Sequence, residues 1–160
     1  MGEADRAYER ALSFLEKRDR TEREVFQKLS GAGFSEEAAA AALQRLSGAG
    51  LVNDESYAER YLEALIAKGR GRLRIAAEMR RKGLKEELVR NTLEDGFPPE
   101  TERTMAAEAA KRAMAEAPEG TDPRKAAAKV SRRLVSLGFS YEVIGDAMGK
   151  LREEDGGEGY

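Results

Sequence analysis

The chain has 160 residues, of which 28 are basic and 30 acidic, so its formal net charge is −2. It contains neither cysteine nor histidine, which excludes disulfide frameworks, thiolate zinc sites and Ser-His-Asp catalysis. No apolar run approaches the roughly 20 residues of a membrane-spanning helix. The first residues also lack the apolar region of a secretory signal. We therefore expect a soluble cytoplasmic protein without a membrane segment.

The apolar residues are mostly small. Alanine occurs 26 times, whereas Leu, Ile, Val and Phe together number 29. So few large apolar residues can indicate disorder, but disorder also requires a high net charge, which is missing here. The excess of Ala, Leu, Glu, Lys and Arg favours helices, and Val, Ile and Thr are too few for a sheet. The composition therefore predicts an all-α fold.

Three segments share one pattern around Gly33, Gly83 and Gly138. Apolar residues stand eight and four positions before each glycine, one position after it and ten positions after it. They are Val25, Leu29, Phe34 and Leu43, then Ile75, Met79, Leu84 and Leu93, then Val130, Leu134, Phe139 and Met148. The spacing of four predicts a helix that ends at a left-handed glycine, followed by a second helix. Similar matches in three copies predict an internal repeat.

The helix starts are also marked in the sequence. Thr21 and Glu24 form a capping-box pattern, and Asp122 with Pro123 forms a cap followed by proline. Another amphipathic helix precedes each pair, around residues 7–15, 54–68 and 101–116. We therefore expect three tandem three-helix repeats, residues 1–50, 51–97 and 98–152, in an elongated and curved array. Residues 153–160 form an acidic, Gly-rich tail that we expect to be disordered.

Patterns for catalysis are weak. Gly69-Arg70-Gly71 starts like a phosphate loop but follows a predicted helix and lacks the remaining glycine, so a flexible loop is favoured. Asn53, Asp54 and Glu55 could ligate a hard cation, yet a helix N-cap with acids in its first turn explains them better. The sequence therefore predicts no catalytic residue, no metal site and no cofactor.

The basic residues concentrate on two of the three equivalent helices. Residues 68–82 hold seven basic residues and one acid, and residues 123–138 hold five basic residues and no acid. Such clusters favour binding to an acidic surface or a phosphate backbone. The alternative is a solvated face with local ion pairs, such as Glu78 with Lys82. The predicted binding residues are Lys68, Arg70, Arg72, Arg74, Arg81, Lys82, Lys125, Lys129, Arg132 and Arg133.

A helix-turn-helix interpretation is the second alternative, because the three glycines lie in turns between helices. The helix after the turn would then enter a DNA groove. Its first turn, however, carries acids: Glu36 and Glu37, Glu86 and Glu87, or Glu142. These would face phosphates with negative charge, so sequence-specific DNA reading is disfavoured.

The middle of the chain resembles the RecX family. The resemblance lies in Gly50-Leu51-Val52-Asn53-Asp54, Tyr57-Ala58-Glu59-Arg60-Tyr61-Leu62, Gly69-Arg70-Gly71, Arg74-Ile75, Glu78-Met79 and Lys82-Gly83-Leu84. The chain departs from the family's usual residues at Asn53, Leu65 and Arg72.

This resemblance implies an all-helical protein of three three-helix repeats that is not an enzyme. Family members regulate the RecA recombinase of bacteria: they bind the groove of the RecA–DNA filament, inhibit strand exchange and ATP hydrolysis, and limit filament growth. Some also bind DNA weakly. We therefore expect a monomer whose partner is RecA on single-stranded DNA. A helical-repeat scaffold or DNA-binding protein that acts independently of RecA is the competing hypothesis.

Overall fold

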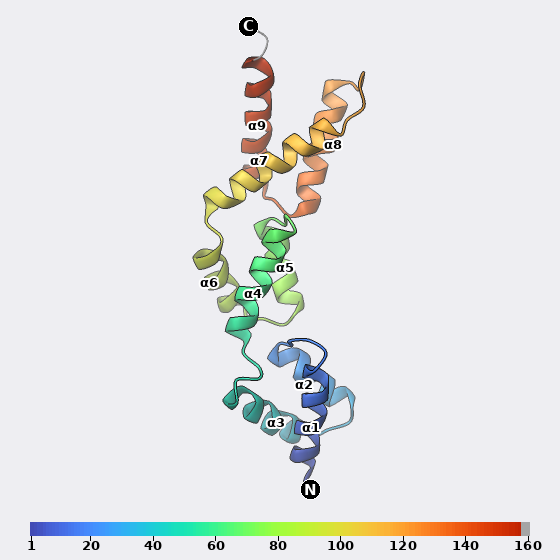
Figure 1. The fold of residues 1–160 in the computed structure, drawn as a ribbon, viewed down its shortest axis with the longest axis vertical. Helices are drawn as coiled ribbons and strands as arrows, with labels where there is room; N and C mark the ends of the chain where they lie inside the picture. Colours follow the sequence, from blue (N-terminus) through green and yellow to red (C-terminus); the bar gives the residue numbers. More distant parts are fainter. Residues whose placement is uncertain (158–160) are drawn as a thin grey trace. The chain divides into compact units, whose positions relative to one another are not determined.

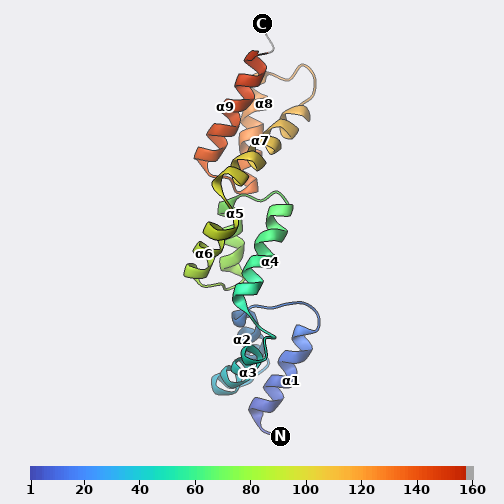
Figure 2. The same ribbon diagram turned by 60° about the vertical axis from the view of Figure 1, so that its left-hand side comes forward.

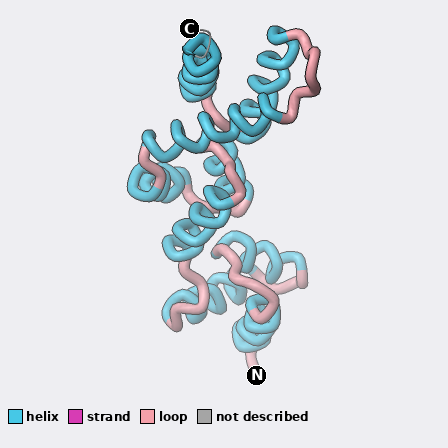
Figure 3. Tube along the Cα trace, turned by 45° about the horizontal axis from the view of Figure 1, so that its top comes forward, coloured by secondary structure: helices cyan, strands magenta, loops and turns pink. Residues whose placement is uncertain are grey.

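A computed structural model describes residues 1–157 of the chain. This part of the chain consists of nine α-helices joined by loops, without a strand (Figures 1 and 3). The all-α, three-helix-repeat fold is therefore confirmed. The helices are α1 Glu3–Leu15, α2 Glu22–Gly31, α3 Glu36–Gly48, α4 Asp54–Ala67, α5 Arg72–Arg81, α6 Glu86–Gly96, α7 Pro99–Ala115, α8 Pro123–Leu137 and α9 Tyr141–Gly157.

These helices form two compact units. Unit 1 comprises residues 1–61 and 78–90, and unit 2 comprises residues 62–77 together with the described residues from 91 onward. The division passes through α4, α5 and α6, so each unit contains one complete three-helix group and part of the middle helices. Each unit is described by itself below.

In unit 1, α1 packs on α3 (Figure 2), and the side chains between the two helices are small. Ala7 and Ala11 on α1 and Ala39 and Ala42 on α3 are fully buried. Alanine lets two helix backbones approach closely, but it removes little apolar area from water. Larger residues supply the rest of this core, namely Val25 and Leu29 of α2, Leu46 of α3 and Val52.

In unit 2, α7 packs against both α8 and α9. Its buried apolar residues are again alanines, Ala106, Ala109 and Ala110. They contact larger side chains on the other two helices, so the small and large residues interdigitate. The larger core residues are Val130, Leu134, Phe139, Val143, Ile144, Met148 and Leu151.

The local signals of the sequence are confirmed. Gly33, Gly83 and Gly138 have φ angles of 94°, 91° and 97°, the left-handed conformation that only glycine adopts without strain. Thr21 and Glu24 form the predicted capping box. Asp122 accepts a hydrogen bond from the Arg124 N–H, with Pro123 at the first helical position. Asn53 accepts one from the Ser56 N–H, as a helix cap does.

The C-terminal boundary differs from the one predicted. Helix α9 continues to Gly157, so residues 153–157 are helical rather than part of a disordered tail. Glu153 and Glu154 are good helix formers, and Lys111 Nζ on α7 lies 3.0 Å from Glu154 Oε1, which favours this continuation. Residues 158–160 of the predicted tail lie outside the described residues. Within the described residues, no helix combines the length and apolarity needed to cross a bilayer.

Candidate interaction surface

The start of α2 binds the turn that ends α5, an arrangement that we name the first junction. The Thr21 hydroxyl donates a hydrogen bond to the Lys82 carbonyl at 2.6 Å. Arg23 Nη2 donates to the Arg81 carbonyl at 3.1 Å. The Glu22 N–H donates to Asp54 Oδ1 at 2.9 Å. Orphan groups at two helix ends thereby satisfy one another.

The start of α5 binds the turn that ends α8 in an equivalent way, which we name the second junction. The Gly71 N–H donates to the Leu137 carbonyl at 2.8 Å. Arg74 Nη1 donates to the Ser136 carbonyl at 3.1 Å. The Arg72 N–H donates to Glu102 Oε2 at 2.7 Å. Both junctions lie within single units.

These junctions engage several of the predicted binding residues. Arg72 is half-buried, and its Nη2 donates to the Phe97 carbonyl at 2.6 Å, so it caps the end of α6. Arg74 is bound at the second junction. Both side chains hold the fold together, so charge periodicity alone overestimated how much of the α5 cluster faces solvent.

The basic residues at the end of α5 have local partners. Arg81 pairs with Glu78 at 3.5 Å, three residues earlier. The Lys82 ammonium lies 5.8 Å from the centre of the Tyr61 ring, a cation–π distance. Arg80 forms a two-pronged pair with Glu86, and this hydrogen-bonded guanidinium holds the pKa of Glu86 below its ordinary value. The solvated-face interpretation therefore fits this end of α5 well.

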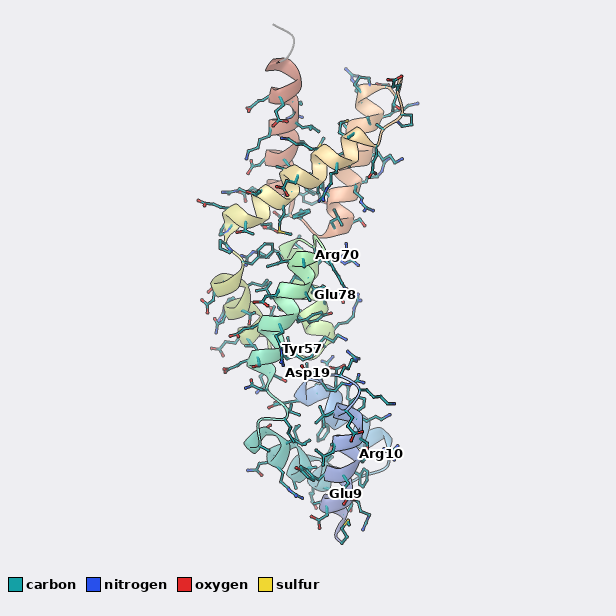
Figure 4. The ribbon with its side chains drawn as sticks, viewed as in Figure 1. Glu9, Arg10, Asp19, Tyr57, Arg70 and Glu78 are labelled. Atoms are coloured by element: carbon teal, nitrogen blue, oxygen red, sulfur yellow. The ribbon has the colours of Figure 1, made fainter. Side chains whose placement is uncertain are left out.

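Tyr57 of α4 lies near the loop between α1 and α2, and Tyr61 stands one turn further along α4. Figure 4 labels Tyr57 beside Asp19, and Asp19 pairs with Arg60 at 3.1 Å. The two rings meet edge to face with centroids 5.6 Å apart. Burial raises the pKa of both phenols, so both stay protonated at neutral pH. This part of the RecX-like signature therefore packs the first junction.

Unit 2 brings other predicted residues together around a cavity of about 400 Å³, the loop pocket. It lies between the α4–α5 loop, α7 and α8. Figure 4 labels Arg70 in that loop. Its cationic lining consists of Lys68, Arg70, Arg112 and Arg133, and Glu108 and Glu116 also line it. Four cations against two acids leave the pocket net positive.

A second hollow of about 530 Å³, the α8 groove, adjoins the loop pocket and shares Ala113, Glu116 and Arg133 with it. The end of α7 and the loop after it form one wall, and α8 forms the other. Its floor includes buried Ala126 and Val130. The exposed side chains of Lys125, Lys129, Arg132 and Arg133 line α8. The structure thus brings together six of the ten predicted residues around two neighbouring hollows.

Arg112 lines the loop pocket but was missing from the predicted set. It lies in the last turn of α7, a helix whose thin apolar stripe drew attention only to its core positions. Arg112 stands four residues after Glu108, and this spacing of two charged residues predicts an exposed face of α7. From this spacing Arg112 could have been placed on the surface. The spacing of α7 alone could not show that this face meets the α4–α5 loop.

The described residues contain no group of three or more acids that could hold a metal ion together. The acids after each glycine turn, Glu36, Glu37, Glu86, Glu87 and Glu142, are exposed. A helix that presents carboxylates first is poorly suited to a DNA groove. Unit 2 carries the basic hollows described above, and the fold is that of a helical-repeat protein.

Comparison with known proteins agrees with this class. Residues 7–46 match the first three-helix domain of RecX, and residues 53–93 match the second. The regulatory protein RecX of Chromohalobacter salexigens is 33% identical over 138 residues, which cover 86% of this chain and 88% of that protein. RecX of Mycolicibacterium vanbaalenii is 36% identical, covering 85% and 73%.

Solved structures agree as well. The crystal structure of RecX from Lactobacillus salivarius superposes with a TM-score of 0.84 over 94% of this chain and 97% of that chain, at 22% identity, and so shows the shared fold. A second crystal structure of a regulatory protein RecX gives a TM-score of 0.74 at 30% identity, covering 90% and 72%. The chain belongs to the RecX family of regulatory proteins.

Proposed function

We propose that this chain is a non-enzymatic inhibitor of the RecA recombinase. It binds as a monomer to the RecA filament on single-stranded DNA in the cytoplasm. Binding lowers the DNA-dependent ATPase of RecA, slows strand exchange and limits filament extension. Direct binding to DNA is weak by comparison.

One observation supports the position of the contact. Lys68, Arg70, Lys125, Lys129, Arg132 and Arg133 gather around the loop pocket and the α8 groove. Within the described residues, none of these six forms an ion pair. A cluster of exposed cations attracts an acidic surface over roughly a Debye length.

The test reverses charge on α8 and on a control surface. Lys129→Glu with Arg132→Glu changes two exposed cations of the α8 groove. Arg10→Glu with Lys17→Glu makes the same charge change on exposed residues in and just after α1. Pairs that include Arg23 or Arg74 are unsuitable, because these side chains bind the junction carbonyls. Circular dichroism should show wild-type helix content for both doubles.

Binding is measured by co-sedimentation with RecA on single-stranded DNA and with that DNA alone. Inhibition is measured as the loss of the DNA-dependent ATPase activity of RecA, and both measurements are made at two salt concentrations. The α8 double should raise the concentration for half-maximal ATPase inhibition about tenfold, roughly 1.4 kcal/mol. The α1 double should behave like the wild type. Equal inhibition by all three proteins at low salt would refute the contact site. Equal sedimentation with DNA alone and with the filament would favour a DNA-binding protein that acts independently of RecA.

A further inference from the structure

The α8 groove differs from the loop pocket in what lies beneath its charges. Ala126 and Val130 of its floor are buried, and Ala117 and Pro118 contribute apolar surface from the opposite wall. The cations stand along α8 on one side of this apolar strip. The loop pocket also has apolar lining residues, among them buried Ala109, but its charged groups stand on all three contributing segments and include two acids.

The loop that forms the far wall is held in place by its own hydrogen bonds. The Thr121 hydroxyl donates to the Pro118 carbonyl at 2.6 Å, and the Thr121 N–H donates to the same carbonyl at 3.2 Å. The Asp122 cap and Pro123 then fix the start of α8. The groove is therefore preformed, which lowers the entropic cost of binding a ligand there.

A phosphate backbone needs only cations and hydrogen-bond donors, and it gains nothing from an apolar floor. Single-stranded nucleic acid usually adds bases stacked on aromatic rings. The residues that line the α8 groove include no aromatic side chain. An apolar floor beneath a row of cations instead complements a peptide that carries apolar side chains on one face and carboxylates beside them.

We propose that the α8 groove binds an acidic amphipathic helix of a partner protein. The partner's apolar side chains lie on Val130, Ala126 and the Ala117–Pro118 wall, and its carboxylates pair with Lys125, Lys129 and Arg132. The single acid of the lining, Glu116, stands on the α7 side and favours a partner whose carboxylates face α8. This inference rests on the proposed function in one respect: the protein component of the filament would supply the acidic helix.

Binding is tested with three fluorescent probes and the full chain, by fluorescence anisotropy. The first probe is a short peptide with Leu and Phe at helical spacing and Asp or Glu elsewhere. The second has the same charge but Ser in place of the apolar residues, and the third is a short oligo-dT. The first probe should bind at least about tenfold more tightly than the second, because only the first covers the apolar floor.

Two variants separate the floor from the charges. Ala128 is exposed on α8 and lines the groove, so Ala128→Trp should fill the groove without altering the core. It should weaken the amphipathic peptide about tenfold and leave the Ser peptide and oligo-dT unchanged. Ala40→Trp, on an exposed site of α3, is the matched control and should bind all probes as the wild type does. Lys129→Glu with Arg132→Glu should weaken all three probes.

Equal affinity for the two peptides would overturn the proposal, and so would a failure of Ala128→Trp to affect the amphipathic peptide. Stronger binding of oligo-dT than of both peptides would assign the groove to nucleic acid instead. Filament co-sedimentation with the same variants distinguishes this failure from that of the proposed function. If the charge reversals weaken filament binding and inhibition while Ala128→Trp retains both, the filament contact stands and the peptide groove is wrong.

Discussion

The two junctions make the same contact with different groups. At the first, the Lys82 carbonyl accepts a hydrogen bond from the Thr21 hydroxyl. At the second, the equivalent Leu137 carbonyl accepts one from the Gly71 backbone N–H. Thr21 and Gly71 both stand twelve residues before their repeat's turn glycine, Gly33 or Gly83. A side chain therefore spans the gap in one junction, whereas backbone meets backbone in the other.

The acids of the two junctions are equivalent too. Asp54 accepts a hydrogen bond from the Glu22 N–H, and Glu102 accepts one from the Arg72 N–H. Glu22 follows Thr21 in the sequence, as Arg72 follows Gly71. Both junctions bury polar groups: Thr21 is 0% exposed and Glu102 is 5% exposed. Buried polar groups stabilise only when all their hydrogen bonds form, so each junction is specific for one register of the two helix ends. Successive repeats thus join through directional contacts in addition to apolar ones.

The largest expected effect comes from Gly71→Ala at the second junction. An added Cβ would lie 2.6 Å from the Gly138 carbonyl group and the Phe139 nitrogen, and backbone atoms cannot move aside as a flexible side chain can. We expect a loss of about 3 kcal/mol in the free energy of unfolding, the upper part of the range for overpacking. Urea denaturation followed by circular dichroism measures it.

Gly145→Ala is the control for this substitution. Gly145 lies inside α9, with open space around the added methyl group. The change should stabilise the protein by about 0.5–1 kcal/mol, because alanine restricts the unfolded chain and favours helix. If both variants lost stability equally, close packing at Gly71 would not be the cause.

The three turn glycines give the next largest effects, and their order tests the comparison directly. Alanine in the left-handed conformation costs about 1–2 kcal/mol at each of them. At Gly33 the added methyl meets open space, so only that cost applies. At Gly83 it meets the Arg23 side chain, and at Gly138 it lies 2.7 Å from the Arg74 backbone nitrogen. The loss should therefore be largest for Gly138→Ala, smaller for Gly83→Ala and smallest for Gly33→Ala.

Thermal and urea unfolding of the three variants measure this order. The difference between Gly138→Ala and Gly33→Ala should reach about 1 kcal/mol, since overpacking adds to the backbone strain. Three equal losses would show that the left-handed conformation alone matters and that the junctions tolerate a methyl group.

These glycines also show what sequence could and could not predict. The turn at Gly83 follows from apolar spacing along one helix and a residue type, both local features. The packing role of Gly71 depends on a backbone more than 60 residues away. Sequence therefore indicated only a flexible loop at Gly69-Arg70-Gly71. The shared position of Gly71 and Thr21 relative to the turn glycines was the available signal.

The predicted binding residues also divide into those whose exposure follows from local sequence and those whose contacts depend on distant parts of the chain. Lys129 and Arg132 were predicted on an exposed face because Val130 and Leu134 define the buried face of the same helix, and α8 has this arrangement. Arg74 met the same criterion on α5, whereas Arg72 was predicted only because it belongs to the basic cluster of residues 68–82. Helical periodicity separates a helix's apolar face from its polar face, but it cannot tell which polar residues a following repeat will cover. Junction contacts therefore bind both arginines.

A loss smaller than that of Gly71→Ala is expected from Thr21→Val at the first junction. Valine keeps the shape of threonine but removes the donor to the Lys82 carbonyl and the acceptor for the Glu24 N–H. Leaving these groups unpaired should cost about 2 kcal/mol. Urea unfolding measures the loss, and Thr21→Ser, which keeps the hydroxyl, should lose clearly less. If the serine variant lost as much as the valine variant, the methyl packing of Thr21 would outweigh its hydrogen bonds.

The smallest effect concerns the acid of the first junction and appears only as pH changes. Burial raises the pKa of Asp54 above its ordinary value of 3.8, and the charge of nearby Glu22 raises it further, although the Glu22 N–H bond opposes the shift. The folded state therefore retains a proton that the unfolded state loses between pH 3.8 and the raised value. Stability from this group falls as pH rises through that window and stays lower above it.

Asp54→Asn keeps an oxygen acceptor for Glu22 but removes the titration, so it should flatten this fall. At pH 7 Asp54→Asn should raise the free energy of unfolding by less than about 1 kcal/mol, because water reaches the half-exposed carboxyl group. Urea unfolding from pH 3.5 upward measures it, and Glu22→Gln should remove a smaller part of the same fall. A wild-type pH profile in Asp54→Asn would show that this carboxyl does not titrate differently in the folded and unfolded chain.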